Sequence, residues 1–338
     1  MKKIAVGILA AMLGFFAVFY FRGQQKEPIT ATSFKLNTIV KVTIYDSRDE
    51  DLLVEALALC DKYEKIFSRT LTDSELYQLN HRGLPLENGA YTLSEPLAEL
   101  TEKGLFYSGL SQGAFDISIE PVSSLWDFTS GEKIIPDEKE IEEALPLVNY
   151  KDVKLSGTQL QFAKEGMGLE LGAIAKGYIA DKIKEYLVSQ GVKSAIIDLG
   201  GNVLCIGMRP DQNPFRIGIQ RPFAERNETV ATVEICDQSV VSSGIYERYF
   251  EKDGTLYHHI LNPESGYPYD NDLVSVTIIS DKSVDGDGLS TSCFTLGLEQ
   301  GMELANSLEG VYGVFITADG ELHFTEGLEE EFALAYAE

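Results

Sequence analysis

Short stretches that alternate apolar and polar residues fill the second half of the chain, and turn residues separate them. Strands are predicted at 194–199, 203–208, 215–220, 229–235, 274–280, 311–317 and 321–325, with a hairpin at 248–261 folded about Asp253-Gly254. Strands in hairpin order pair antiparallel, whereas a repeated βαβ winding would insert a helix between neighbours. The sequence therefore predicts an α+β fold with mixed, mainly antiparallel sheets and packed helices.

Helical spacing marks the segments between and before these strands. One strand at 34–45 leads into a helix from Leu52 to Phe67, and Ser94 can cap the next helix. Further helices are predicted at 138–145, from near Ala173 to Gly191, at 286–298 and at 302–308. No composition break divides the chain after Pro28, so we expect residues 29–338 to form one domain.

The first 28 residues differ from the rest. Lys2 and Lys3 precede an apolar run over 4–21 that is close to the roughly 20 residues needed to span a bilayer. No small-x-small cleavage site follows, which favours an uncleaved anchor over a cleaved signal peptide. The two lysines predict a cell-membrane protein with a single-pass N-terminal anchor at 1–28 and the domain on the extracytoplasmic side.

The charge balance excludes one class of partner. The net charge is -25, from 28 Lys and Arg against 53 Asp and Glu, and no basic patch is visible. Phosphate-backbone binding needs clustered cations, so we expect no nucleic-acid partner. The glycine-rich fingerprints of dinucleotide folds and P-loops are also missing, so a nucleotide site must be built differently.

Asp287 and Thr291 stand four residues apart in a predicted helix, so their oxygens face the same side. A carboxylate and a hydroxyl suit Mg²⁺, which keeps water or substrate phosphate as its other ligands. The alternative is a helix cap in which Asp285 or Asp287 accepts backbone N–H groups.

Glu170 and Lys176 flank the start of the helix near Ala173, where free N–H groups favour anions. Small residues surround Lys176, which indicates that a bulky group approaches the backbone there. The alternative is an ordinary surface pair on an amphipathic helix.

Only four histidines occur, so each is informative. His258 and His259 point to opposite faces if they lie on a strand. His259 precedes the loop at 262–268 and is our candidate general base, with a near-neutral pKa. A strand histidine bonded to a carbonyl is the alternative. Phe115 and Asp116 offer a ring and an acceptor to a heterocycle, or belong to the core and a cap.

Taken together, these residues resemble the ApbE family, the FAD:protein FMN transferases. Six pieces occur in the family's order between about 36 and about 297: Phe67-Ser68 with Asp73-Ser74-Glu75-Leu76, Gly113-Ala114-Phe115-Asp116, 170–178, Asp198-Leu199-Gly200-Gly201-Asn202, His259-Ile260-Leu261-Asn262-Pro263 with Gly266, and Asp287-Gly288-Leu289-Ser290-Thr291.

The resemblance implies the site. FAD is contacted by Ala114, Phe115, Asp116, Glu170, Lys176 and Ile260, and His259 matches the family's catalytic histidine. The Ala173 carbonyl, Asp287 and Thr291 hold Mg²⁺. Leu36 and Thr70 also fall at the flavin, where many members have Met on the first strand and Tyr before the Asp-Ser-Glu segment.

The implied reaction is Mg²⁺-dependent transfer of FMN from FAD, the donor substrate, to a Ser or Thr hydroxyl of an exported acceptor flavoprotein, with release of AMP. Hydrolysis of FAD to FMN and AMP on the same metal is one alternative, and flavin binding without turnover is another.

Overall fold

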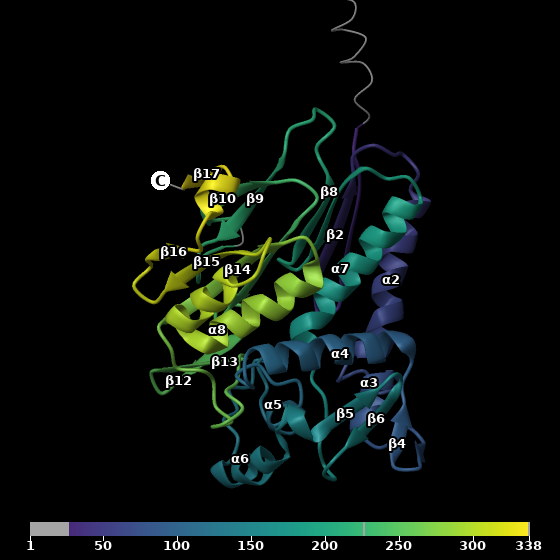
Figure 1. The fold of residues 1–338 in the computed structure, drawn as a ribbon, viewed down its shortest axis with the longest axis vertical. Coiled ribbons are helices and arrows are strands. Elements are labelled where there is room, and N and C mark those ends of the chain that lie inside the picture. The colour runs from purple at the N-terminus through teal and green to yellow at the C-terminus, as the bar shows by residue number, and fades with distance from the viewer. Residues whose placement is uncertain (1–26, 226, 337–338) are drawn as a thin grey trace, which may run out of the picture.

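The structure, a computed structural model, describes residues 27–225 and 227–336. Its centre is an eight-stranded sheet (Figure 1). Across the sheet, the strands are β1 (Ile29–Lys35), β2 (Thr38–Ile44), β7 (Ser194–Leu199), β8 (Val203–Gly207), β11 (Ser239–Gly244), β14 (Leu273–Ser280), β15 (Tyr312–Thr317) and β16 (Leu322–Phe324). All neighbours pair antiparallel, as the hairpin order of the sequence predicts.

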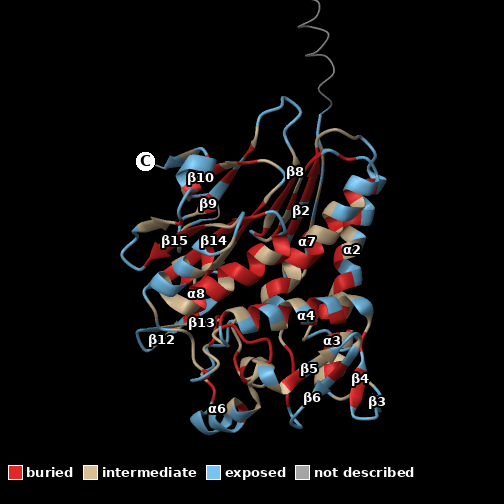
Figure 2. Cartoon of the chain, in the orientation of Figure 1, coloured by how far each residue is buried: buried red, intermediate tan, exposed pale blue. Residues whose placement is uncertain are grey.

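Helices pack on one face of this sheet and enclose the main core (Figure 1). The helices on the sheet are α2 (Asp51–Phe67), α7 (Gly172–Ser189) and α8 (Ser283–Asn306), and α4 (Glu95–Leu110) packs across their ends. Val40, Val42 and Ile44 point toward them from β2 because side chains alternate along a strand. The predicted apolar side of α7, which includes Ile174 and Ile183, is buried. Figure 2 shows buried residues along the sheet and on α7 and α8.

A small sheet covers part of the opposite face. It contains β17 (Leu334–Tyr336), β10 (Thr229–Ile235) and β9 (Phe215–Gln220), and α9 (Leu328–Glu331) lies close by. Its apolar side chains form a second core with Cys205, Ile279 and Val314 of the large sheet. Every residue of β14 is buried, because that strand has a core on each face.

The remaining elements lie at one end of the large sheet (Figure 1). A four-stranded sheet contains β3 (Leu86–Glu87), β4 (Ala90–Thr92), β6 (Gln159–Phe162) and β5 (Val153–Ser156). The short helices are α3 (Glu75–Asn80), α5 (Glu120–Ser123) and α6 (Glu138–Ala144), with 3-10 turns at Leu145–Leu147 and Tyr150–Asp152. The hairpin of β12 (Tyr249–Lys252) and β13 (Thr255–His258) packs with α5 and α6 around Trp126.

Two of the strands differ from the sequence prediction. The single strand expected at 34–45 is wrong: Leu36 and Asn37 have φ of 52° and 59° and form a turn between β1 and β2. β11 was not predicted, because its Ser242-Ser243-Gly244 end resembles a loop. The four cysteines are free thiols, of which Cys236 is partly buried and the other three are buried.

The two helices predicted near the end of the chain are both present: they make up α8, which is divided at Gly297, whose φ of 80° and ψ of 178° are not helical. The anchor predicted at 1–28 lies almost wholly outside the described residues. Among the residues that the structure describes, no helix is long and apolar enough to cross a membrane.

Candidate functional site

The N-terminal half of α7 lies directly against the first turns of α8. At Gly177 the two backbones approach so closely that a Cβ there would lie 2.5 Å from the carbonyl carbon of Ser283 and 2.6 Å from Cα of Val284. Carbon atoms normally stay about 3.5–4.0 Å apart, so no side chain fits at Gly177. This contact brings the segments containing Lys176 and Asp287 together.

The Asp287 carboxylate is buried at this contact, with 4% of its surface exposed. Its Oδ2 accepts the Gly177 N–H at 2.5 Å, and its Oδ1 accepts the Asn202 side-chain amide at 3.0 Å. No ion pair reaches Asp287 from any described side chain. Burial raises the pKa of this carboxyl, while Lys176 and the two hydrogen bonds lower it. A buried carboxylate without an ion pair is costly unless a cation approaches it.

Thr291 lies one turn after Asp287 on the same helix. Its Oγ1 is 2.9 Å from Oγ of Ser243, which is also 2.8 Å from Oγ of Ser290. Ser243 belongs to β11, so the sheet fixes the position of the Thr291 hydroxyl. The predicted pair of oxygens is thereby held between α8, α7 and β11.

Helix capping does not explain Asp287. The first N–H groups of α8, from Ser283 and Val284, donate to the Asp181 carboxylate of α7 at 2.9 and 3.0 Å. Asp285 instead accepts the Tyr107 hydroxyl at 2.5 Å and the Lys103 ammonium at 3.1 Å. Neither carboxylate therefore caps α8, although Asp287 accepts one backbone N–H, that of Gly177 in α7.

Ala173 lies four residues before Gly177 on α7. In an α-helix the N–H of Gly177 is the ordinary donor to the carbonyl of Ala173. Since that N–H donates to Asp287, the carboxylate and the Ala173 carbonyl compete for one hydrogen. The carbonyl thus has capacity for another partner.

These oxygens fit a hard divalent cation. One carboxylate, one hydroxyl and one carbonyl form a sparse set of protein ligands, which suits an ion that keeps water or phosphate oxygens. No group of three or more His, Cys, Asp or Glu side chains suited to a metal occurs within the described residues. The predicted site has only one of these side chains, Asp287, so the protein would provide only part of the ligands of the ion.

Glu170 forms an ion pair with Arg69, a partner that the sequence pattern does not indicate. Arg69 forms an ion pair with Glu170 Oε2, and Ser123 donates to the same oxygen at 3.2 Å. Glu170 Oε1 accepts the N–H of Gly172 at 3.3 Å, at the start of α7. Glu170 is therefore anchored at the start of α7, and its contact with FAD stays a prediction.

His259 lies beside this region, at the end of the β12–β13 hairpin. Its backbone N–H and its Nδ1 both lie 3.2 Å from the Arg248 carbonyl. Burial lowers the pKa of His259 to about 3, and the charges of Arg248, His258 and Lys176 lower it further. The near-neutral pKa that we expected is wrong, because the ring is desolvated among cations. His259 is neutral at pH 7 and can accept a proton.

His258 points elsewhere, as alternation along a strand predicts. Its Nε2 lies 2.9 Å from the carbonyl of Tyr269, and its ring meets Phe294 edge to face at 6.2 Å. Burial lowers its pKa to about 4. Both histidines therefore lie within hydrogen-bond distance of a backbone carbonyl, as the alternative for His259 states, and the role of His259 as a general base stays a prediction.

The loop at 114–116 connects to the same histidine segment. Tyr269 donates its hydroxyl to the Ala114 carbonyl at 2.8 Å, and the Tyr269 N–H bonds to the Ile260 carbonyl at 3.0 Å. Phe115 and Ile260 are both buried in the main core, with 6% and 7% exposed. Ala114, Phe115 and Ile260 therefore lie in one connected region.

Asp116 mainly holds its own loop. Its Oδ1 accepts the N–H and hydroxyl of Ser118 at 2.7 and 2.6 Å, and its Oδ2 accepts the Tyr150 N–H at 2.8 Å. Burial raises the pKa of this carboxyl. These bonds match the capping alternative, and contact of Asp116 with FAD stays a prediction.

Leu36 and Thr70 lie on two turns. Leu36 is in the turn between β1 and β2, where Thr38 packs against Gly200; a Cβ at Gly200 would lie 2.8 Å from Cβ of Thr38. Thr70 is exposed, and its N–H lies 3.3 Å from the Ser68 hydroxyl. Gly200 precedes Asn202, the partner of Asp287, by two residues, so the Leu36 turn adjoins the Asp287 contact.

Comparison with known proteins identifies related sequences and a related structure. The sequence model of the ApbE family matches residues 36–316. Two proteins named FAD:protein FMN transferase, from Klebsiella pneumoniae (strain 342) and Treponema pallidum (strain Nichols), are 38% and 33% identical to the chain. They cover 82% and 87% of it, and 85% of their own length in both cases. The crystal structure of an ApbE protein from Thermotoga maritima superposes with a TM-score of 0.81 at 27% identity, over 90% of this chain and 99% of that one.

Proposed function

The chain belongs to the ApbE family, and on that basis we propose that it transfers FMN from FAD to an acceptor protein. The observation that carries the proposal is the Gly177–Asp287 hydrogen bond, which joins the FAD-binding and metal-binding segments that the sequence predicts. The proposal extends to Mg²⁺, to a Ser or Thr acceptor and to an exported partner.

Asp287, Thr291 and the Ala173 carbonyl are the residues that would hold Mg²⁺. Mg²⁺ held by these residues would supply positive charge against the diphosphate oxygens and the departing phosphate. Asn202 and Gly177 orient the carboxylate, and Ser243 orients the Thr291 hydroxyl. Such partners of metal ligands commonly affect metal affinity 10–100-fold.

Lys176 provides a fixed positive charge next to this centre. Its positive charge lowers the pKa of both Asp287 and His259, so it is close enough to act on the metal segment and on the base. A chain of net charge -25 repels a dinucleotide over most of its surface. Lys176 therefore helps to bind the FAD diphosphate at this position.

His259 takes the proton in the proposed reaction. The acceptor oxygen forms a bond to the phosphorus on the FMN side of FAD, and the bond from that phosphorus to the oxygen shared with AMP breaks. The hydroxyl proton passes to the neutral imidazole, and AMP leaves with the electron pair. The acceptor then carries FMN through a phosphodiester.

The site of action follows from the N-terminal segment. An anchor at 1–28 would hold the domain on the extracytoplasmic side of the cell membrane, where exported flavoproteins would meet it. This part of the proposal rests on the sequence alone.

Mass spectrometry tests the proposed transfer. The soluble part of the chain is mixed with FAD, Mg²⁺ and a candidate exported protein, and the acceptor is expected to gain one FMN phosphoryl group on a Ser or Thr. Asp287→Asn is expected to abolish the gain. Asp285→Asn is the matched control, because it removes a carboxylate of the same helix that faces Tyr107 and Lys103.

Release of AMP distinguishes the alternatives. Rapid AMP release from FAD and Mg²⁺ without acceptor would identify a hydrolase. FAD that stays intact with both Mg²⁺ and acceptor present would identify a binding protein. Either result would contradict the transferase.

A further inference from the structure

A chain of buried hydrogen bonds ends at the Asp287 carboxylate. The Ser239 hydroxyl donates to Oγ of Ser283 at 3.0 Å, and the Ser283 hydroxyl donates to Oδ1 of Asn202 at 2.6 Å. The side-chain amide of Asn202 then donates to Oδ1 of Asp287 at 3.0 Å. None of these side chains belongs to a residue more than 4% exposed, so the chain is shielded from bulk water.

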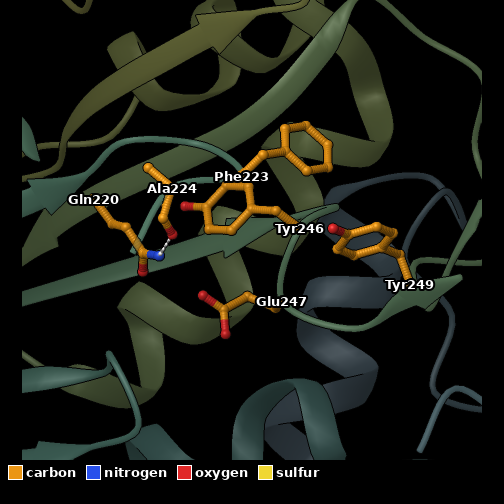
Figure 3. A pocket seen from close by; sticks show the side chains of 6 residues that line it. All are labelled: Gln220, Phe223, Ala224, Tyr246, Glu247 and Tyr249. Atoms are coloured by element: carbon orange, nitrogen blue, oxygen red, sulfur yellow. Dashed lines mark hydrogen bonds between the residues drawn. The ribbon is translucent and has the colours of Figure 1, made fainter. Parts of the chain in front are cut away.

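The chain lies on the face of the large sheet that packs against α8. Ser239 and Ser243 are four residues apart on β11, so both point to this face, and Ser243 holds Thr291 there. Gly244 belongs to the other face, where a Cβ would lie 2.5 Å from the Tyr246 ring. That ring lines the pocket of about 230 Å³ drawn in Figure 3, which is therefore separate from the chain.

The backbone around Asn202 is fixed by its turn. The Asn202 carbonyl accepts the N–H of Leu199 at 2.9 Å, and the Asp198 carboxylate accepts the N–H of Gly201 at 2.9 Å. The terminal amide can still adopt two orientations half a turn apart, because its C=O and NH₂ groups have nearly the same shape. Only one orientation directs the NH₂ group at Asp287.

Ser283 favours that orientation. Ser239 donates to the Ser283 oxygen, which leaves the Ser283 hydrogen for Oδ1 of Asn202. A reversed amide would place its oxygen against Oδ1 of Asp287, where the 3.0 Å hydrogen bond now lies. Two acceptors would then face each other without a hydrogen between them, which is costly for buried groups.

The backbone of Ser283 is itself held on two sides. Its N–H donates to Oδ1 of Asp181 at 2.9 Å, and its carbonyl carbon packs against Gly177. The hydroxyl therefore starts from a fixed backbone at the first turn of α8. This is the geometry that a residue needs to orient a neighbouring amide.

We propose that Ser283 is a positioning residue for the divalent ion of the proposed reaction and acts through Asn202 on Asp287. The amide on Oδ1 and the Gly177 N–H on Oδ2 fix the carboxylate, and each oxygen keeps a further lone pair for a cation. The proposal rests on the proposed function, because it concerns the ion site of that reaction.

Titration with Mn²⁺ tests this role in the FAD-loaded protein. Ser283→Ala should weaken Mn²⁺ binding about fivefold, the effect expected from the loss of one hydrogen bond. Ser292→Ala is the matched control, because Ser292 is also fully buried on α8 and no described residue forms a hydrogen bond with its hydroxyl. The control should bind Mn²⁺ as the wild type does.

A double-mutant cycle distinguishes positioning from a general loss of stability. If Ser283 acts through Asn202, adding Ser283→Ala to Asn202→Ala should change the Mn²⁺ affinity by less than about twofold. A merely structural role would lower the affinity by the same factor in both backgrounds. Ser283→Cys retains a weak S–H donor and should bind Mn²⁺ with an affinity between those of the wild type and Ser283→Ala. The Cys variant replaces the Ala variant in the cycle if the latter does not fold.

The outcomes separate this proposal from the proposed function. Wild-type Mn²⁺ affinity in Ser283→Ala, or in Ser283→Cys where the Ala variant does not fold, would overturn the role of Ser283 and leave the metal site intact. Equal losses in both backgrounds of the cycle would also overturn it. Absence of Mn²⁺ binding in the wild type would overturn both proposals. The expected cycle together with no FMN transfer to any acceptor would support the role of Ser283 and count against the proposed function.

Discussion

Replacing Gly177 by Ala tests the helix contact on which the site depends. The added Cβ would lie 2.5 Å from the carbonyl carbon of Ser283, and an ordinary carbon contact needs about 3.5 Å, so α7 and α8 must separate by roughly 1 Å. Overpacking of this kind costs about 1–3 kcal/mol, and here both neighbours are backbone, which cannot rotate away. Ala gains up to about 1 kcal/mol of helix propensity over Gly. We expect a net loss of about 2 kcal/mol.

The separation also affects function, because the Gly177 N–H that holds Asp287 moves with the helix. Thermal unfolding without metal should show a fall in Tm of roughly 5 °C for a chain of this size. Mn²⁺ affinity, measured as a surrogate for Mg²⁺, should fall about tenfold or more.

Gly109→Ala is the matched control, because Gly109 is also helical and the nearest atom to its added Cβ is 4.0 Å away. It should be neutral or slightly stabilising. If Gly177→Ala matches this control in both Tm and metal affinity, the close contact does not support the site as we argue.

Three other predictions concern neighbouring residues. Burial raises the pKa of Asp181 to about 6, so the folded protein binds a proton at this carboxyl more tightly than the unfolded chain does. That proton stabilises the fold at low pH, and the stabilisation is lost as the pH rises through 6. The stability of the wild type relative to Asp181→Asn, from urea unfolding, should therefore grow by about 2 kcal/mol from pH 7 to pH 4, and a constant difference would contradict this. Asn202→Ala leaves Asp287 Oδ1 without its amide donor and should weaken Mn²⁺ binding about tenfold while FAD binding persists; unchanged metal affinity would exclude the role of Asn202. Because the pKa of His259 is about 3, protonation of this residue should not lower kcat/KM between pH 8 and pH 5. His259→Ala should lower kcat by about 10²–10⁴. A fall in kcat/KM near pH 6.5 that is absent from the variant would contradict the lowered pKa.

The sequence predicted those parts of the site that depend on local spacing. Asp287 and Thr291 share a helix, so their four-residue interval alone places both oxygens on one side. The start of α7 follows from small residues and apolar periodicity, and the hairpin order of the strands gave antiparallel sheets. These features need only the geometry of single elements.

The missed residues depend on contacts between distant segments. Asn202 belongs to a Gly-Gly-Asn turn, and only the packing of that turn against α8 makes it a partner of Asp287. Ser243 lies on β11, a central strand of the large sheet whose polar residues at one end resemble a loop in the sequence. Arg69 stands beside a predicted flavin residue, but its ion pair with Glu170 spans segments far apart in the sequence. The pKa of His259 likewise depends on burial among cations that no pattern shows.

The most direct test of the account is the binding of a divalent ion to the FAD-loaded protein, measured by titration with Mn²⁺. We expect one site in the wild type, and at least 100-fold weaker binding after Asp287→Asn or Thr291→Val, with Asp285→Asn unchanged. Equal affinity in the wild type and Asp287→Asn would contradict the claim that this carboxylate, held by Gly177 and Asn202, holds the ion that FMN transfer requires.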